Sequence, residues 1–360
     1  MTQKEFCKKY NLTEAQFLGK EKIEGNLDLR SVTTLPENCS LTCGGSLFLR
    51  SLTTLPENCS LTCGGSLDLS SLTTLPENCS LTCGGDLYLS SLTTLPENCS
   101  LTCGGYLDLS SLKTLPENCS LTCGGYLYLS SLKTLPENCS LTCGGTLYLS
   151  SLKTLPENCS LTCGGTLILR SVTTLPENCS LTCGGSLDLS SLTTLPEKYE
   201  FTVGDKVYLP EGINCNYTKQ EGIISFQNGK YIIVDCILTE VVSKRGNVYH
   251  VKKIGSDKVT YVVTDGNKFS HGDTLKEAKE SLIYKIGNRD KSRYSNLKKS
   301  SKLSLAEMIE CYRVITGACE AGVRNFITSV GKVKSEYKIS DIIKITKEQY
   351  GNAEFAKFFN

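Results

Sequence analysis

A unit of 20 residues recurs nine times between Leu27 and Leu195, and its commonest form is S-L-D-L-S-S-L-T-T-L-P-E-N-C-S-L-T-C-G-G. No insertion or deletion interrupts the repeat, so equivalent positions recur at one fixed interval. A chain of this kind folds into a solenoid, in which each unit is one coil and equivalent residues stack in columns. We therefore predict a solenoid of nine coils over residues 26–197.

Each coil contains two segments in which inward and outward residues alternate with the period of a β-strand. They are Leu47-Phe48-Leu49 and Cys39-Ser40-Leu41-Thr42-Cys43 in one coil. We expect the leucines and cysteines to point inward and form a continuous core. The pair Gly44-Gly45 is predicted to turn one corner with positive φ, and Pro36 is predicted to mark the opposite corner.

The pattern L-x-L…L-x-x-L-P over residues 27–197 resembles the short bacterial type of leucine-rich repeat. That family carries an inward Asn where this chain has Val32, Leu52, Leu72 and their equivalents. This difference favours a straighter, right-handed rod that resembles a β-helix with two sheets. The near-identical coils are also similar to those of repeat proteins from bacteria and their phages. The predicted fold class is therefore mainly β, with an α+β domain after the solenoid.

Both ends of such a core need a cap. Residues 1–25 contain two capping boxes, Thr2-x-x-Glu5 and Thr13-x-x-Gln16, which predict two short helices that cover the first coil. The repeat breaks after residue 197, and the C-terminal domain is predicted to be the second cap.

The 21 cysteines would suggest a secreted, disulfide-rich protein, but sixteen of them belong to two repeat columns, Cys39 to Cys179 and Cys43 to Cys183. On a strand, the two cysteines of one coil lie too far apart to bind one metal ion. Packing as free thiols is the favoured interpretation. Vertical disulfides between coils, or a metal or redox role, are the alternatives. We expect neither a disulfide framework nor a metal site or cofactor.

The N-terminal segment lacks the apolar core of a signal peptide, and no stretch approaches the length needed to span a membrane. We therefore expect a cytoplasmic protein without a membrane partner.

The coils differ chiefly in two outward columns next to the first strand and in one column beyond it. The position-48 column consists of Asp28, Phe48, Asp68, Tyr88, Asp108, Tyr128, Tyr148, Ile168 and Asp188. The position-46 column consists of Asn26, Ser46, Ser66, Asp86, Tyr106, Tyr126, Thr146, Thr166 and Ser186. Lysine replaces threonine on three successive coils, at Lys113, Lys133 and Lys153.

We predict that one strip of Tyr88, Tyr106, Tyr126, Tyr128, Tyr148 and the three lysines binds a partner, most simply a protein. Exposed aromatic rings beside cations are typical of recognition surfaces. The alternative is random variation at tolerant surface positions after a recent duplication.

The net charge of +1 conceals two different halves. Residues 1–197 carry 11 basic and 18 acidic residues, whereas residues 198–360 carry 27 and 19. Alternating apolar runs and Gly-containing turns predict an antiparallel β meander over residues 198–272. Capping boxes at Thr274-x-x-Glu277 and Ser304-x-x-Glu307 begin a helical part, residues 273–360, which is predicted to pack with the meander as one domain. The ten residues from Phe269 to Ala278 resemble the strand-turn-helix signature of HicB-like antitoxin domains.

A basic segment offers a second candidate site. Its cations are Lys285, Arg289, Lys291, Arg293, Lys298, Lys299 and Lys302, with Tyr294 among them for base stacking. It is either a set of phosphate contacts for nucleic acid or a solvated linker. The two histidines, His250 and His271, lie near no nucleophile or base in sequence, and Cys319 lacks the flanking pattern of ubiquitin-transferring effectors. We therefore predict a non-enzymatic recognition protein; the alternative is a targeting solenoid fused to a nucleic-acid-binding or effector domain.

Overall fold

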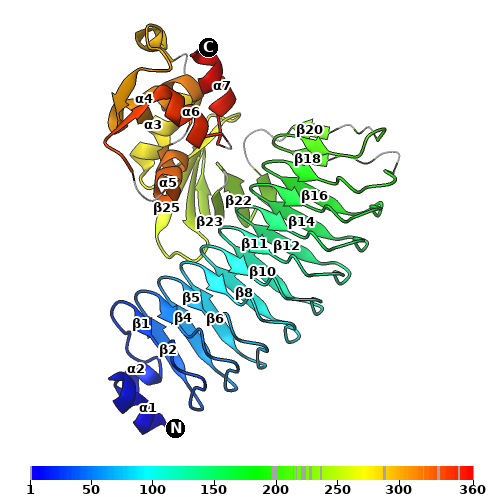
Figure 1. Ribbon diagram of the computed structural model, residues 1–360, viewed down its shortest axis with the longest axis vertical. Coiled ribbons are helices and arrows are strands. Elements are labelled where there is room, and N and C mark those ends of the chain that lie inside the picture. Colours follow the sequence, from blue (N-terminus) through cyan, green and yellow to red (C-terminus); the bar gives the residue numbers. More distant parts are fainter. Residues whose placement is uncertain are drawn as a thin grey trace. The chain divides into compact units, whose positions relative to one another are not determined.

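The computed structural model describes residues 2–196, 199, 201–213, 215, 217–219, 224–226, 229–235, 237–286, 289–318, 320–330, 333–347 and 349–359. The chain forms two compact units (Figure 1). Unit 1 contains residues 1–220, 236–240 and 253–257, and unit 2 contains residues 221–235, 241–252 and 258–360.

Unit 1 is a β-solenoid built from two parallel sheets of ten strands each. Sheet 1 consists of β1 (Leu27–Asp28), β3 (Leu47–Phe48), β5 (Leu67–Asp68), β7 (Leu87–Tyr88), β9 (Leu107–Asp108), β11 (Leu127–Tyr128), β13 (Leu147–Tyr148), β15 (Leu167–Ile168), β17 (Leu187–Asp188) and β19 (Val207–Tyr208). Sheet 2 consists of β2 (Ser40–Cys43), β4 (Ser60–Cys63), β6 (Ser80–Cys83), β8 (Ser100–Cys103), β10 (Ser120–Cys123), β12 (Ser140–Cys143), β14 (Ser160–Cys163), β16 (Ser180–Cys183), β18 (Phe201–Val203) and β20 (Tyr217–Lys219). Within the repeats the paired strand residues lie 20 positions apart in sequence, so the predicted columns are confirmed.

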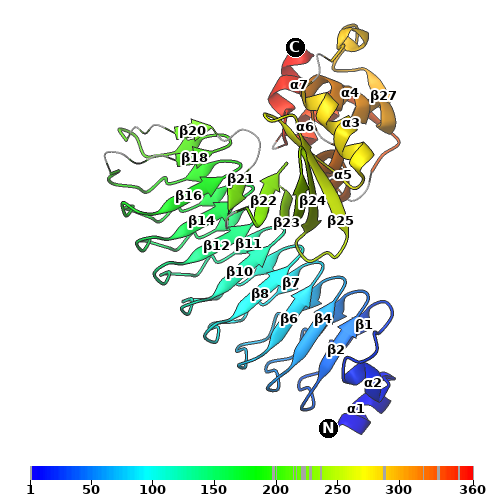
Figure 2. The same cartoon turned by 180° about the vertical axis from the view of Figure 1, so that it is seen from behind.

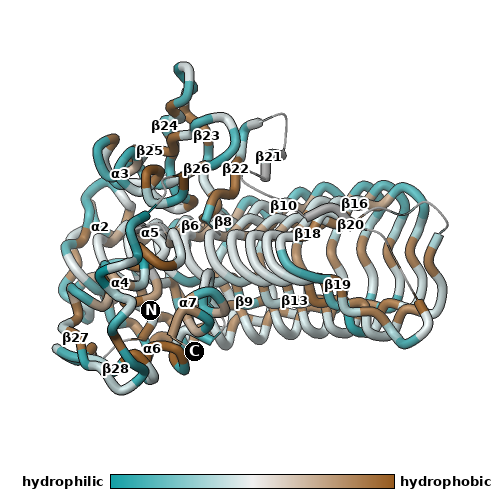
Figure 3. The backbone as a smooth tube through the Cα atoms, turned by 90° about the horizontal axis from the view of Figure 1, so that it is seen from above, coloured by the Kyte–Doolittle hydropathy of each residue, from teal (hydrophilic) through white to brown (hydrophobic). Residues whose placement is uncertain are grey.

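The core of the solenoid is the predicted stack of leucines and cysteines. Leu47, Leu49 and Leu52 are fully buried, and their equivalents in the other coils are buried in the same way. The same sequence of polar and apolar segments recurs from coil to coil (Figure 3). The chain is therefore a mainly β solenoid of 20-residue coils followed by an α+β region, as the repeat predicted.

The corners of the coils differ from the prediction. The paired glycines, such as Gly64, do not have positive φ, but a Cβ on Gly64 would lie 2.3 Å from the carbonyl oxygen of Gly44. Glycine is therefore required there because adjacent coils approach closely. The left-handed conformation belongs instead to the asparagine after the Pro-Glu pair in seven coils, at Asn38, Asn58, Asn78, Asn98, Asn118, Asn138 and Asn158. Asparagine tolerates this conformation better than other residues with a Cβ.

The N-terminal end is capped by α1 (Gln3–Tyr10) and α2 (Glu14–Phe17), and both predicted capping boxes are present. Phe6 and Phe17 are fully buried against the core and contact each other with ring centroids 5.7 Å apart.

The solenoid continues past residue 197, where the sequence predicted a meander to begin. Thr202 and Val203 pair parallel with Thr182 and Cys183 of the preceding coil, and Val207-Tyr208 pairs with Leu187-Asp188. These residues form a tenth, degenerate coil in which phenylalanine and valine replace leucine and cysteine. The boundary predicted at residue 197 is therefore wrong.

Unit 2 contains most of a six-stranded sheet in the order β21-β22-β23-β24-β25-β26 (Figure 2). The strands are β21 (Ile224–Phe226), β22 (Tyr231–Val234), β23 (Ile237–Arg245), β24 (Val248–Lys253), β25 (Val259–Thr264) and β26 (Phe269–Gly272). The pairs β21–β22, β24–β25 and β25–β26 are antiparallel. The antiparallel sheet of the predicted meander therefore exists, but it begins at β21.

Helices cover part of this sheet and form a second core beside it. The elements are α3 (Leu275–Ile286), the 3-10 turn Ser292–Tyr294, β27 (Lys302–Ser304), α4 (Leu305–Thr316), α5 (Glu320–Val330), β28 (Glu336–Lys338), α6 (Ile339–Ile345) and α7 (Asn352–Phe358). Ala278 and Leu282 of α3 pack on Val263 of β25. Phe355 of α7 and Ile315 of α4 lie in the second core.

Candidate functional site

The five predicted tyrosines lie on the outward face of sheet 1. Tyr88, Tyr128 and Tyr148 belong to β7, β11 and β13, whereas Tyr106 and Tyr126 immediately precede β9 and β11. The side chains of Tyr106 and Tyr126 are 40% and 37% exposed, and the other three are half-buried. We call these five residues the tyrosine strip.

Four rings of the tyrosine strip form one connected cluster. Tyr106 and Tyr126 stack with centroids 4.8 Å apart and planes 8° from parallel, and Tyr128 and Tyr148 stack at 4.7 Å and 13°. The two stacks meet edge to face, since Tyr126 lies 6.3 Å from both Tyr128 and Tyr148 at steep interplanar angles. Aromatic pairs in these arrangements stabilise each other beyond their buried area. The rings therefore form an ordered surface.

The position-46 column has a structural role that the tyrosines cannot fulfil. In several coils its side-chain oxygen accepts a hydrogen bond from the backbone N–H of the equivalent residue in the next coil. The bonds are Ser46 to Asn26 Oδ1 (2.7 Å), Ser66 to Ser46 Oγ (3.0 Å), Asp86 to Ser66 Oγ (3.1 Å), Tyr106 to Asp86 Oδ1 (2.8 Å) and Thr166 to Thr146 Oγ1 (3.4 Å). Tyrosine has no oxygen close to Cβ, so Tyr106 and Tyr126 cannot accept such a bond. The Tyr106–Tyr126 and Tyr126–Thr146 junctions therefore lack this bond, and among the described coils the Thr166–Ser186 junction lacks it as well.

Tyr88 is held at the edge of the strip by a hydrogen bond. Its hydroxyl donates to Asp86 Oδ2 at 3.0 Å. Partial burial and the Asp86 carboxylate raise the pKa of Tyr88 to about 12. Partial burial and neighbouring side chains also raise the pKa of Tyr106, Tyr128 and Tyr148. These phenols therefore stay protonated at neutral pH and can donate hydrogen bonds.

The predicted lysines are exposed but lie away from the rings. A turn at Ser110-Ser111 separates β9 from Lys113, and the same turn recurs before Lys133 and Lys153. Lys133 stacks on Lys113, since its backbone N–H donates to the Lys113 carbonyl at 3.2 Å. Among the described residues, the cation–π contacts involve other pairs. The lysines therefore border the tyrosine strip without joining its aromatic cluster.

Charged residues occupy the two ends of the same face. Arg30 pairs with Asp28 at 2.6 Å, and Arg170 pairs with Asp188 at 2.7 Å. Arg50 is exposed next to Phe48 in the second coil. In the coils that carry the tyrosine strip, the positions equivalent to Arg30, Arg50 and Arg170 are occupied by serine.

The cysteine columns lie in the core, as predicted. The column from Cys43 to Cys183 is buried throughout, and its thiols donate to a nearby carbonyl, as from Cys63 to Gly65 at 3.3 Å. Burial raises the pKa of Cys143 well above its usual value. In one vertical pair, Cys159 and Cys179, the sulfur atoms lie 2.8 Å apart. Every cysteine that the structure describes is a free thiol.

Most cations of the basic segment have partners within unit 2. Lys285 pairs with Asp235 and donates to the carbonyl of Phe269, and Arg289 donates to the carbonyl of Tyr284. Lys291 pairs with Glu354 at 2.8 Å, and Arg293 with Glu310 at 2.6 Å. Lys298, Lys299 and Lys302 are exposed.

Tyr294 is 7% exposed, so the prediction that it is available for base stacking is wrong. Its ring belongs to the core between α4 and α6, and the guanidinium of Arg293 lies over it at 4.6 Å. The segment is therefore neither a solvated linker nor an open row of cations with a free ring.

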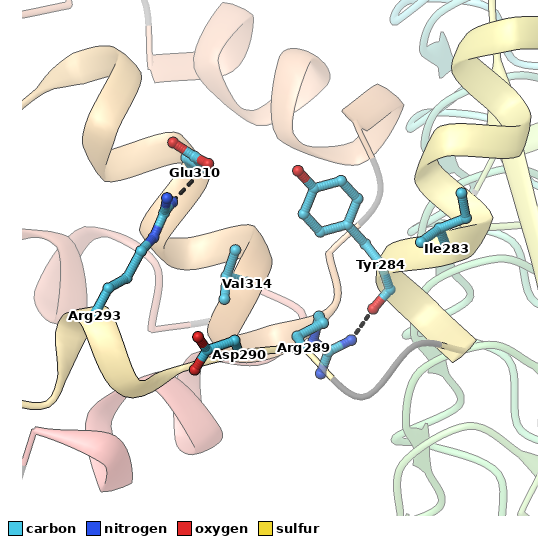
Figure 4. A pocket seen from close by; sticks show the side chains of 7 residues that line it. All are labelled: Ile283, Tyr284, Arg289, Asp290, Arg293, Glu310 and Val314. Carbon is cyan, nitrogen blue, oxygen red and sulfur yellow. Dashed lines mark hydrogen bonds and ion pairs between the residues drawn. The ribbon is translucent and has the colours of Figure 1, made fainter.

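A cavity of about 350 Å³ lies in unit 2 between α3 and α4 (Figure 4). Its lining combines Arg289, Asp290, Arg293 and Glu310 with apolar side chains. Arg293 is bound to Glu310 and Arg289 to the Tyr284 carbonyl, as the dashed lines show. Of the two histidines, His271 is buried with its Nδ1 4.0 Å from Asp235, and His250 is bound to the Ser243 hydroxyl at 2.9 Å.

Within the described residues, no group of three or more histidine, cysteine, aspartate or glutamate side chains is arranged to hold a metal ion. In the same part of the chain, no helix combines the length and the apolar character needed to cross a membrane. Comparison with protein-family models, with curated protein sequences and with solved structures finds no match to this chain.

Proposed function

We propose that this chain is a non-enzymatic recognition protein that binds a protein partner through the tyrosine strip and the lysines that border it. The observation that carries this proposal is the connected cluster of Tyr106, Tyr126, Tyr128 and Tyr148 on an exposed sheet face. Ordered tyrosines give a large contact area at a low cost in side-chain entropy. The rings are already held by one another before a partner arrives.

A second observation argues against random variation as the origin of the strip. Tyr106 and Tyr126 replace residues whose side-chain oxygens support the next coil, as Asp86 supports Tyr106 at 2.8 Å. A hydrogen bond of this kind contributes about 0.5–1.5 kcal/mol to stability. Two adjacent substitutions that forgo this support are better explained by a benefit on the outer surface than by tolerance.

The alternative proposal, nucleic-acid binding by the C-terminal region, has less support. The cations Lys285, Lys291 and Arg293 are engaged by acidic residues, and the ring of Tyr294 is buried. A salt-dependent affinity of the full chain for RNA or DNA would favour this alternative, because phosphate contacts weaken steeply as salt increases.

We also propose that the coils are a variant of the leucine-rich repeat and that the protein acts in the cytoplasm of a bacterial cell or with its phage. The support is the L-x-L…L-x-x-L-P spacing and the many free thiols, which persist in reducing compartments. Because its side chains point outward, the tyrosine strip, and not the core, would determine the specificity of binding.

The test is capture of partners from a lysate of the source cells by the immobilised full chain. A variant with Tyr106, Tyr126, Tyr128 and Tyr148 changed to Ser should lose the specific partner. A control variant changes Thr33, Thr53, Thr73 and Thr93, which are exposed on other coils, to Ser and should retain it. If the tyrosine variant captured the same proteins as the wild type, the proposal would be wrong.

A further inference from the structure

The outward face of sheet 1 has a charge pattern that is complementary to itself. We number the coils 1 to 10 by their residues in the position-48 column, from Asp28 in coil 1 to Tyr208 in coil 10. The tyrosine strip then occupies coils 4 to 7, and its midpoint lies between coils 5 and 6. Resting on the proposed function, we infer that the partner of the tyrosine strip is a second copy of this chain, docked face to face.

The symmetry of such a pair follows from the sheet geometry. A two-fold axis that lies between the sheets, along the strand direction, reverses the coil order while each column still faces itself. With the axis between coils 5 and 6, coil 4 faces coil 7 and coil 5 faces coil 6. Tyr106 then faces Tyr126 of the second copy, and Tyr88 faces Tyr148. The aromatic blocks therefore overlap completely.

The charges outside the aromatic block also match under this operation. Coil 2 faces coil 9, which places Phe48 opposite Asp188 of the second copy and Arg50 only two residues along the strand from that carboxylate. Coil 3 faces coil 8, which places Asp68 opposite Ile168 and the neighbouring Arg170. Arg170 and Arg50 are exposed on their own chain and can reach across the interface. Opposite charges across an interface select the register.

The remaining carboxylates on the outward face of sheet 1 lie opposite hydrogen-bond donors of the second copy. Asp108 of coil 5 faces Tyr128 of coil 6, and Asp86 of coil 4 faces Thr146 of coil 7. Asp28 of coil 1 faces coil 10, which carries Lys206 and Tyr208. In this register no carboxylate of the two columns faces another carboxylate.

Neighbouring arrangements lack this property. A shift of one coil in one direction places Asp108 opposite its own copy, and a shift in the other direction places Asp68 opposite Asp188. If both solenoids ran in the same direction, every aspartate of the position-48 column would face its own copy. Like charges placed together disfavour these alternatives by several kcal/mol. The sequence of the face therefore specifies one antiparallel register.

The available area is sufficient for a specific dimer. Ten coils spaced about 4.8 Å apart and three outward columns about 14 Å wide give a footprint of roughly 670 Å² per copy, or roughly 1,300 Å² in total. Stable interfaces between proteins begin at about 1,200 Å². The lysines at positions 113, 133 and 153 lie beyond the turn and outside this footprint.

Sedimentation velocity of the full chain over a concentration series tests the inference. The wild type should sediment as a dimer at micromolar concentration. Arg50→Glu places two like-charge contacts in the interface and should raise the dissociation constant at least about tenfold. Adding Asp188→Asn to Arg50→Glu should recover part of that loss, because the introduced carboxylate then faces a neutral amide. Lys4→Glu, the same charge change on the exposed surface of α1, should leave the dimer intact.

The outcomes separate this inference from the proposed function. The inference is overturned if the wild type is monomeric at about 100 µM. It is also overturned if the dimer is left unaltered by both Arg50→Glu and the four Tyr→Ser changes. If the wild type is monomeric but the Tyr→Ser variant loses a captured partner, the proposed function stands and only the self-association is wrong. If the Tyr→Ser variant changes neither property, both fail.

Discussion

At the scale of single residues, the corner asparagines carry the conformational strain of the solenoid. Asn118 has φ 57°, a region that residues with a Cβ seldom adopt. Asn118→Ala should therefore destabilise the protein by about 1 kcal/mol, whereas Asn118→Gly should cost less, since glycine adopts this conformation freely. Urea unfolding of the two variants checks the expectation. Equal midpoints for alanine and glycine would show that the left-handed turn does not limit stability.

Tyr88 gives a prediction about alkaline pH. Its pKa is raised to about 12 in the folded state, whereas a phenol in an unfolded chain ionises near about 10. The folded state thus binds the proton more tightly than the unfolded state, and the protonated Tyr88 phenol contributes to the free energy of unfolding. This contribution is complete below a pH of about 10 and is lost as the pH rises to about 12. Urea midpoints should fall more steeply with pH for the wild type than for Tyr88→Phe. In an Asp86→Asn background the difference should shrink, because the Asp86 carboxylate that helps to raise the pKa is absent.

At the scale of elements, the capping box of α4 is a clear local determinant. The backbone N–H of Glu307 donates to Ser304 Oγ at 3.4 Å, and the N–H of Ser304 donates to Glu307 Oε2 at 2.9 Å. Ser304→Ala removes one acceptor and should lower the free energy of unfolding by about 1 kcal/mol. Ser304→Asp keeps an acceptor and should preserve most of the stability. Chemical denaturation with a probe in unit 2 measures both, and an equal loss for both variants would contradict the capping explanation.

The elements that the sequence predicted well are those whose pattern repeats. Alternation in segments such as Leu47-Phe48-Leu49 placed both sheets and their core correctly, because inward and outward positions follow directly from strand period. The corners could not be predicted in the same way. Gly64 looked like a residue for positive φ, yet its need for a missing Cβ comes from Gly44, 20 residues earlier.

The tenth coil was missed because its residues changed while their spacing did not. Phe201, Val203 and Val207 occupy positions that hold leucine or cysteine in the earlier coils, and Thr202 and Gly204 are retained. A search for spacing instead of identity would have found it.

The candidate site was predicted in part. Its tyrosines share a face because a column is fixed by the repeat, but their distance from Lys113 depends on the intervening turn. The burial of Tyr294 depends on packing between helices distant in sequence, which no local pattern reveals.

At the scale of the whole molecule, the repeat makes coil number adjustable. Residues 60–79 form one complete unit, and their deletion joins Cys59 to Ser80 with the same sequence that the junction has now. We expect this deletion to give a folded, shorter solenoid, since each coil packs mainly on the two adjacent coils. Deletion of residues 60–69 removes half a coil and should abolish cooperative unfolding. Circular dichroism and thermal unfolding distinguish the two, and a disordered product from the 20-residue deletion would contradict the modular description.

Two backbone amides that lack a hydrogen bond in the position-46 column can be used to detect whether a partner covers the tyrosine strip. The N–H groups of Tyr126 and Thr146 follow tyrosines in that column, whereas the N–H of Asp86 is bound to Ser66 Oγ at 3.1 Å. In the isolated chain these two amides should exchange with deuterium faster than that of Asp86. When a partner covers the tyrosine strip, their exchange should slow without any change in the solenoid itself. Hydrogen exchange at two backbone positions would thus record when the surface is covered, even for a partner that has not been identified.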